Sequence, residues 1–110
     1  MKRVILESPY AGDIEANIAY GRRCVRDSVL RGEAPIASHL LYTQPGILDD
    51  SKPDERQLGI DAGLSWRCVA EATVVYEDLG ITRGMYYGIS AAKEAGLPVE
   101  YRKINDCSSI

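Results

Sequence analysis

The sequence predicts an α/β fold: a flavodoxin-like or Rossmann-like three-layer sandwich built on a mostly parallel sheet of four strands. Short β-prone runs alternate with longer helical segments, in the order strand, helix, strand, loop, helix, strand, helix, strand. The run from Ala72 to Glu77 contains an unbroken Thr-Val-Val-Tyr, which is typical of a parallel strand buried on both faces. Right-handed crossovers leave few ways to connect such elements, and we expect the strand order 2-1-3-4.

Turn and capping residues predict where the elements begin and end. We expect strands at residues 3–7, 35–38, 72–77 and 99–102, and helices that begin near residues 14, 53 and 85. Asp13 is a suitable N-cap for the first helix and Gly32 a suitable residue to end it. Pro53, followed by two acidic residues, is a fair start for the second helix. The polar loop before it is longer than most loops within a domain, and such loops are often functional.

The composition is that of an ordinary globular domain. At 110 residues we expect one domain, residues 1–104, followed by a frayed tail at 105–110. The net charge of −3 argues against general nucleic-acid binding, which normally needs a basic face. No apolar run approaches the roughly 20 residues that span a bilayer, so we expect no membrane association. Cys24, Cys68 and Cys107 are odd in number and lack a Cys-x-x-Cys spacing, which indicates reduced thiols in a cytoplasmic protein.

No pattern in the sequence predicts a bound cofactor or metal ion. The first predicted strand is not followed by Gly-x-Gly-x-x-Gly, and there is no Walker A lysine motif. His39 is the only histidine, and no second histidine or cysteine pair exists to complete a transition-metal site. We therefore expect neither a cofactor nor a metal.

The predicted ligand site lies where the winding direction of the sheet reverses, between the first and third strands. That point brings the turn at 8–12 opposite the turn at 78–84, and the second strand delivers His39 beside them. The helix after the second turn presents free N–H groups and its positive dipole end there, which suits a phosphate or another anion. The expected ligand-binding residues are Ser8, Tyr10, Gly12, His39, Asp49, Arg56, Asp78, Thr82, Arg83, Gly84 and Met85.

His39 and Asp78 are also the candidate catalytic groups. An imidazole at a strand end can act as acid, base or hydrogen-bond donor, or it can simply satisfy backbone groups. Asp78 is favoured over Glu77 because neighbouring strand residues point to opposite faces and Asp78 is already in the turn. Its alternative role is charge compensation at the helix N-terminus. The charged residues around the long loop would hold a ribose hydroxyl or, alternatively, pair with one another in a surface ion-pair network: Asp49, Asp50, Asp54, Glu55 and Arg56.

Several aromatic side chains are predicted near the cleft. The tyrosines in this group would stack on a base or, alternatively, pack in the core or at the rim: Tyr10, Tyr42, Tyr86 and Tyr87. Trp66, expected in the middle of a helix, is most simply a core residue or an oligomer contact.

Four short motifs occur in an order and spacing that resemble a known group. They are Ser8-Pro9-Tyr10-x-Gly12 after the first strand, Pro35 through His39-Leu40-Leu41, Glu55-Arg56 with Gly59, and Thr82-x-Gly84-Met85. Together, over most of the chain, they resemble small phage and bacterial proteins related to the nucleoside 2-deoxyribosyltransferases. The resemblance implies a flavodoxin-like fold, a nucleoside or nucleotide pocket, and homo-oligomers with shared sites.

The family pattern places a nucleophilic glutamate four residues after a glycine, followed by an Ala-rich helix and Gly-x-Pro-Val. This chain matches that frame at Gly84, Ala92, Gly96, Pro98 and Val99, but Gly88 stands where the resemblance places the glutamate. A glycosyl-enzyme intermediate needs a carboxylate at the anomeric carbon. Asp78 or Glu7 would substitute only through a changed mechanism. The resemblance therefore implies a retained pocket without the family's covalent chemistry.

We accordingly expect a small homo-oligomer that binds a nucleotide, a nucleoside derivative or an ADP-ribose-like molecule; in a phage, one use would be to sequester a signalling nucleotide. One alternative is an N-glycosidase or deoxyribosyltransferase that acts on nucleosides or nucleotides, with His39 or Asp78 as acid or base. The other is a protein-interaction module with a vestigial cleft, in which Trp66 or the tyrosines serve the interface.

Overall fold

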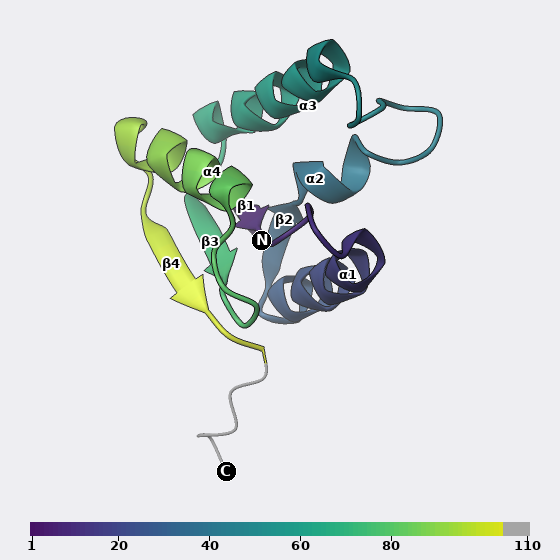
Figure 1. The fold of residues 1–110 in the computed structure, drawn as a ribbon. Helices are drawn as coiled ribbons and strands as arrows, with labels where there is room; N and C mark the ends of the chain where they lie inside the picture. The colour runs from purple at the N-terminus through teal and green to yellow at the C-terminus, as the bar shows by residue number, and fades with distance from the viewer. Residues whose placement is uncertain (105–110) are drawn as a thin grey trace.

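The computed structural model describes residues 1–104, and the tail expected at 105–110 lies outside the described residues. The strands are β1 (Lys2–Glu7), β2 (Glu33–Ile36), β3 (Ala72–Tyr76) and β4 (Val99–Arg102). They form one sheet in the order β2-β1-β3-β4, and every neighbouring pair is parallel (Figure 1). The predicted fold class and strand order are therefore confirmed, as a flavodoxin-like α/β arrangement.

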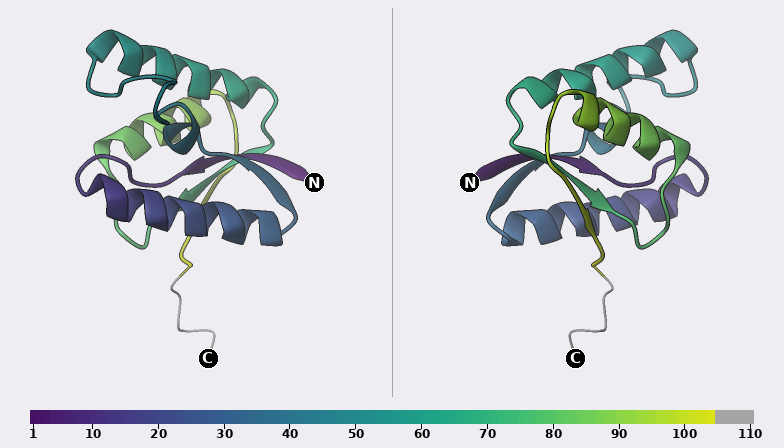
Figure 2. Two further views of the ribbon diagram at one scale, coloured as in Figure 1. Left: turned by 90° about the vertical axis from the view of Figure 1, so that its right-hand side faces the viewer. Right: turned by 90° about the vertical axis from the view of Figure 1, so that its left-hand side faces the viewer.

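Helices cover both faces of the sheet and complete the three-layer sandwich. α1 (Ile14–Leu30) lies on one face, whereas α3 (Pro53–Ser65), α4 (Arg83–Glu94) and the single turn of α2 (Ser38–Leu41) lie on the other (Figure 2). A short 3-10 turn, η1 (Trp66–Cys68), follows α3. Within residues 1–104, no helix combines the length and the apolar character that crossing a membrane would require.

The alternation of side chains along β1 and β3 divides the core into two clusters. The cluster on the α1 side contains Val4, Leu6, Tyr20, Cys24, Ala37, Ala72, Val74 and Tyr76. The cluster on the α4 side contains Val75, Met85 and Ile89. Every residue of β3 is buried, as the unbroken β-prone run predicts. Because each buried valine or leucine contributes about 1.5–3 kcal/mol, the two central strands are a firm support for the loops at their carboxyl ends.

The second strand begins and ends two residues earlier than predicted. β2 pairs with β1 from Glu33 to Ile36, and Pro35 is tolerated because β2 is an edge strand. The chain then leaves the sheet, since the carbonyl of Ala37 accepts hydrogen bonds from the N–H groups of Leu40 (3.0 Å) and Leu41 (3.2 Å). Ser38 therefore begins the short helix α2, and His39 lies on this helix.

The third helix also differs from the expectation. α3 ends at Ser65, so Trp66 begins the 3-10 turn and is 44% exposed, rather than lying in the middle of a helix. Leu58, an apolar residue of this helix, is 59% exposed. Gly63 is the one buried residue of α3, and it packs against Ser38 of α2. α3 thus covers α2 and the cavity described below instead of lying flat on the sheet.

The start of α4 is set by its first side chains. The Thr82 hydroxyl accepts a hydrogen bond from the N–H of Met85 (3.3 Å), and the N–H of Thr82 donates to Sδ of Met85 (3.4 Å). This reciprocal cap begins the helix at Arg83. In the turn before it, Gly80 has φ +86°, a left-handed conformation that glycine adopts without strain.

Candidate functional site

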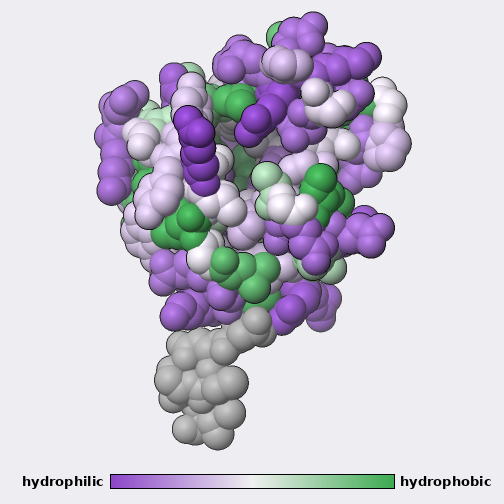
Figure 3. Space-filling model, in the orientation of Figure 1, coloured by the Kyte–Doolittle hydropathy of each residue, from purple (hydrophilic) through white to green (hydrophobic). Residues whose placement is uncertain are grey.

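A cavity of about 470 Å³ lies at the carboxyl ends of β1 and β3, on the side of the sheet that α3 and α4 cover. Its walls come from the end of β1, α2, α3 and the first turns of α4. Figure 3 shows its opening as a hollow between α3 and α4. β2 and β3 flank β1, so the cavity occupies the point where the winding of the sheet reverses, which is where ligands bind in open α/β sheets.

The structure brings most of the predicted site residues together in this cavity. The two segments expected to converge, after β1 and after β3, both contribute to its wall. The predicted residues that line it are Ser8, Tyr10, His39, Arg56, Thr82, Arg83, Gly84 and Met85.

Three predicted site residues lie outside the lining. Gly12 is exposed in the turn before α1, with φ +101°. Asp49 is exposed in the long loop, and its carboxylate accepts hydrogen bonds from the N–H (3.0 Å) and the hydroxyl (2.6 Å) of Ser51. These bonds hold the pKa of Asp49 below its usual range. Asp49 therefore stabilises its own turn.

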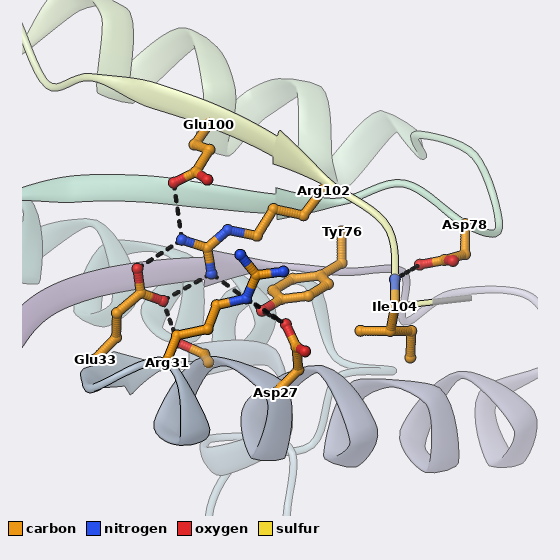
Figure 4. A network of polar contacts seen from close by, with 9 residues as sticks. Asp27, Arg31, Glu33, Tyr76, Asp78, Glu100, Arg102 and Ile104 are labelled. Carbon is orange, nitrogen blue, oxygen red and sulfur yellow. Dashed lines mark hydrogen bonds and ion pairs between the residues drawn. The ribbon is translucent and has the colours of Figure 1, made fainter. Parts of the chain in front are cut away.

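Asp78, the third of these residues, faces the α1 side of the sheet. Its carboxylate accepts hydrogen bonds from the Tyr20 hydroxyl (2.5 Å) and from the N–H of Ile104 (3.0 Å), and its own N–H donates to the Tyr20 oxygen (3.1 Å). Burial, followed by the bond to Asp78, raises the pKa of Tyr20 above its usual range. Figure 4 shows Asp78 beside Ile104. Asp78 thus connects α1, the turn after β3 and the end of β4.

Ser8 and His39 form a close polar pair on the cavity wall. The Ser8 Oγ atom lies 2.6 Å from Nε2 of His39, so one of the two groups donates and the other accepts. Ser8 is only 4% exposed. Removal of the imidazole from water lowers the pKa of His39 to about 4, so the ring is uncharged near neutral pH. The pair can exchange a proton or orient a ligand group, but it adds no charge to the cavity.

The cavity also contains a carboxyl group that the predicted site omitted. Along β1, Val4 and Leu6 point to the α1 side, so Glu7 points to the opposite face and into the cavity. Protein atoms surround its carboxyl group although part of its surface faces the cavity, and this burial raises the pKa of Glu7 to about 8. Among residues 1–104, the structure gives this carboxyl group no hydrogen bond and no ion pair. Glu7 is therefore protonated near neutral pH and without a partner.

Gly88, on the inner side of α4, makes room for this carboxyl group. A Cβ atom added to Gly88 would lie 2.6 Å from Cδ of Glu7, and closer still to Oε2. Real Cβ atoms do not approach other atoms so closely, so any side chain here would displace Glu7. The sequence carried a weak signal for this contact: Glu7 shares the face of Ile5 by the two-residue period of a strand, and a glycine interrupts a helix.

The rim of the cavity is positively charged where α4 begins. Arg83 and Gly84 are exposed, and the first N–H groups of a helix have no partner within it. Nothing lies within 4 Å of a Cβ added to Gly84, so this backbone is open to approach. Arg56 lies across the opening and pairs with Asp50 at 3.9 Å, whereas Arg83 makes no ion pair within the described part of the chain. The helix dipole and Arg83 together suit an anion.

Three tyrosine side chains line the cavity. Tyr10 follows β1, Tyr42 follows α2 and Tyr87 lies on α4, and all three line the cavity. Tyr86, also expected near the cleft, is 59% exposed and lies outside this lining. No group of three or more His, Cys, Asp or Glu side chains in residues 1–104 is arranged to hold a metal ion.

Comparisons with known proteins agree with this architecture. The sequence model of a protein family described as "Domain of unknown function (DUF7768)" matches residues 2–102. A solved structure of the 2-deoxyribosyltransferase from the psychrotolerant bacterium Bacillus psychrosaccharolyticus is similar, with a TM-score of 0.61 and 16% identity. The similarity covers 92% of this chain and 72% of that one. No curated protein matches this chain in sequence.

Proposed function

Since this chain belongs to the DUF7768 family of domains of unknown function, we propose its role from its cavity: the protein binds a nucleoside or a nucleotide there. One observation carries the proposal: a cavity of about 470 Å³ joins a floor whose Glu7 and His39 are uncharged near neutral pH to an opening where Arg83 and the start of α4 provide positive charge. Pockets for small organic ligands commonly measure about 300–1,000 Å³. A nucleotide has the matching polarity, because its sugar and base are uncharged and its phosphate is anionic.

The phosphate binds at the rim. The N–H groups at the start of α4 and the Arg83 guanidinium supply hydrogen bonds and positive charge at one place. The floor does not suit an anion, because Glu7 and His39 are both uncharged near neutral pH and a buried anion without a partner is costly. The sugar therefore lies inward, near Glu7 and the Ser8–His39 pair.

The base stacks on the tyrosine side chains that line the cavity. Tyr10, Tyr42 and Tyr87 line the cavity, and aromatic rings bind flat, uncharged groups. The likeness to a 2-deoxyribosyltransferase whose description concerns the synthesis of nucleosides supports a nucleoside as the ligand. Gly88 gives α4 no carboxylate at this point, which supports binding without a covalent glycosyl-enzyme intermediate.

Isothermal titration calorimetry tests the proposal. The titrants are nucleosides, nucleoside 5′-monophosphates and ADP-ribose, and we expect at least one of them to bind with micromolar affinity. Gly59→Leu places a bulky side chain in the cavity and should abolish binding, whereas Gln57→Leu, on the exposed side of α3, should not. Circular dichroism checks that both variants fold. No heat of binding with any titrant at high micromolar concentration would reject the proposal.

A further inference from the structure

The Glu7 carboxyl group differs from the other acidic side chains that line the cavity, because those have polar partners. Asp50 pairs with Arg56 (3.9 Å), and Glu55 pairs with Lys52 (3.6 Å) and accepts a hydrogen bond from the N–H of Asp49 (3.1 Å). These two acids have partners on the loop and on α3. Glu7 is on the floor, at the end of a central strand, and within residues 1–104 the structure gives it no polar partner.

Burial of a polar group without a partner is costly, so its retention calls for an explanation. The Glu7 carboxyl group occupies the space that a side chain at position 88 would fill, where the end of β1 meets α4, and it faces the cavity. An alanine at position 88 would displace it, so the glycine and the glutamate form one arrangement.

We propose that Glu7 is a general acid, which donates a proton to the departing base of a nucleoside or nucleotide bound in the cavity and so hydrolyses its N-glycosidic bond. The inference rests on the proposed function, because it requires the ligand to be bound with its sugar toward the floor. It goes beyond that function by assigning an activity, a bond and a residue.

The reaction balances with water as the only co-reactant. The bond between C1′ of the sugar and the base nitrogen breaks, its electron pair stays on the nitrogen, and that nitrogen takes the proton of the Glu7 carboxyl group. The oxygen of a water molecule bonds to C1′ and the water loses one proton to solvent. The Glu7 carboxylate regains one proton from solvent, so the products are the free base and the sugar, which keeps its phosphate when the ligand is a nucleotide.

Its protonation state makes Glu7 an acid and not a nucleophile. With a pKa near 8 the carboxyl group holds its proton at neutral pH, as a general acid must, whereas a covalent intermediate would need the ionised form. The other titratable or charged groups of the cavity are His39, Tyr10, Tyr42, Tyr87, Asp50, Glu55, Arg56 and Arg83. None of them causes the shift, which comes from burial alone.

Release of free base, followed by chromatography, tests the inference beside calorimetry on the same ligands. Wild-type protein should release base at neutral pH, and the rate should fall as pH rises above about 8. Glu7→Gln should lower the rate by about 100-fold or more. The dissociation constant of the Glu7→Gln variant for the same ligand should differ from the wild-type value by less than about threefold, because the amide has the shape and neutrality of the protonated carboxyl group. The control Glu94→Gln, exposed on α4, should keep the wild-type rate.

Two results separate this inference from the proposed function. If wild-type protein binds a ligand but releases no base, the inference is overturned and the proposed function stands. The same holds if Glu7→Gln releases base at the wild-type rate. Absence of binding removes both. Gly88→Ala adds a second readout: if it keeps ligand affinity while base release falls, the position of the Glu7 carboxyl group, and not merely its presence, governs the rate.

Discussion

The Arg102 guanidinium of β4 donates two parallel hydrogen bonds to the Glu33 carboxylate of β2, which joins the two edge strands of the sheet (Figure 4). The N···O distances are 2.7 and 2.6 Å, and both residues are 7% exposed. The guanidinium holds the pKa of Glu33 below its ordinary value. Arg102 also donates to the Tyr76 hydroxyl (3.1 Å), which itself donates to Asp27 of α1 (2.7 Å).

Glu33→Ala should lower the free energy of unfolding by about 3–5 kcal/mol, because it leaves a buried guanidinium without its main counter-charge. Glu100→Ala removes another carboxylate from the same guanidinium (2.8 Å), but that side chain is 52% exposed, so its loss should cost less than about 1 kcal/mol. Urea denaturation measures both. Equal losses for the two variants would contradict the prediction.

Glu7 should make the protein less stable as pH rises, which is opposite to the usual effect of a carboxyl group. Its pKa is raised in the folded state from 4.5 to about 8, so between these values the folded protein keeps a proton that the unfolded chain has lost. The stability that this proton provides is complete below pH 4.5 and is lost as pH rises through about 8.

Glu7→Gln should therefore equal wild-type protein in stability near pH 4.5 and exceed it by about 2–4 kcal/mol above pH 8. This range is smaller than the full shift implies, because Glu7 is partly exposed to the cavity. Chemical denaturation at several pH values gives the difference, with Glu94→Gln as control. A difference that stays constant with pH would mean that Glu7 titrates normally.

Two glycines should respond to alanine in opposite ways. A Cβ on Gly63 would lie 2.5 Å from Oγ and 2.7 Å from Cβ of Ser38, so Gly63→Ala should push α3 from α2 and cost about 1–3 kcal/mol. Gly84, in the first turn of α4, has open space around it, so Gly84→Ala should stabilise the protein by about 0.5–1 kcal/mol. Thermal unfolding followed by circular dichroism compares them. A stabilising Gly63→Ala would show that the two helices are not in contact there.

Arg83 should distinguish nucleotides from nucleosides. Arg83→Ala should weaken binding of a nucleoside 5′-monophosphate by about 10- to 100-fold, the value of a hydrogen-bonded charge, and leave the nucleoside unaffected. Arg22→Ala, which removes an exposed arginine from α1 on the other face, is the matched control. Calorimetry gives both affinities. Equal weakening of the two ligands would place Arg83 against the sugar or the base.

Asp78 should matter for folding more than for the ligand. Asp78→Ala removes the acceptor of the Tyr20 hydroxyl and of the N–H of Ile104, and should cost about 1–3 kcal/mol of unfolding free energy. Ligand affinity, measured below the unfolding transition, should stay within about twofold of wild type. If the variant folds but no longer binds the ligand, Asp78 contributes to the ligand site.

The amino-acid sequence alone determined the four strands, the three long helices and their order, because those depend on local chemistry and short periods. Thr73 to Tyr76 form an unbroken β-prone run, so β3 is central and buried. Thr82 caps a helix, and the crossover from one parallel strand to the next through a helix is right-handed. The strand order also determined where the winding of the sheet reverses, and hence where the cavity lies. These properties depend on neighbours within a few residues or on general topology.

Only the tertiary structure decided which side chains face the cavity. Asp78 turns toward Tyr20, which is 58 residues away, and Ser38 begins a helix instead of ending a strand. The two-residue period places Glu7 on the face opposite Leu6, but the cavity on that face exists because α3 and α4 stand apart over it. The protonated state of Glu7 depends in turn on burial and on the open space at Gly88. Contacts between distant segments determine these properties, and no local pattern encodes them.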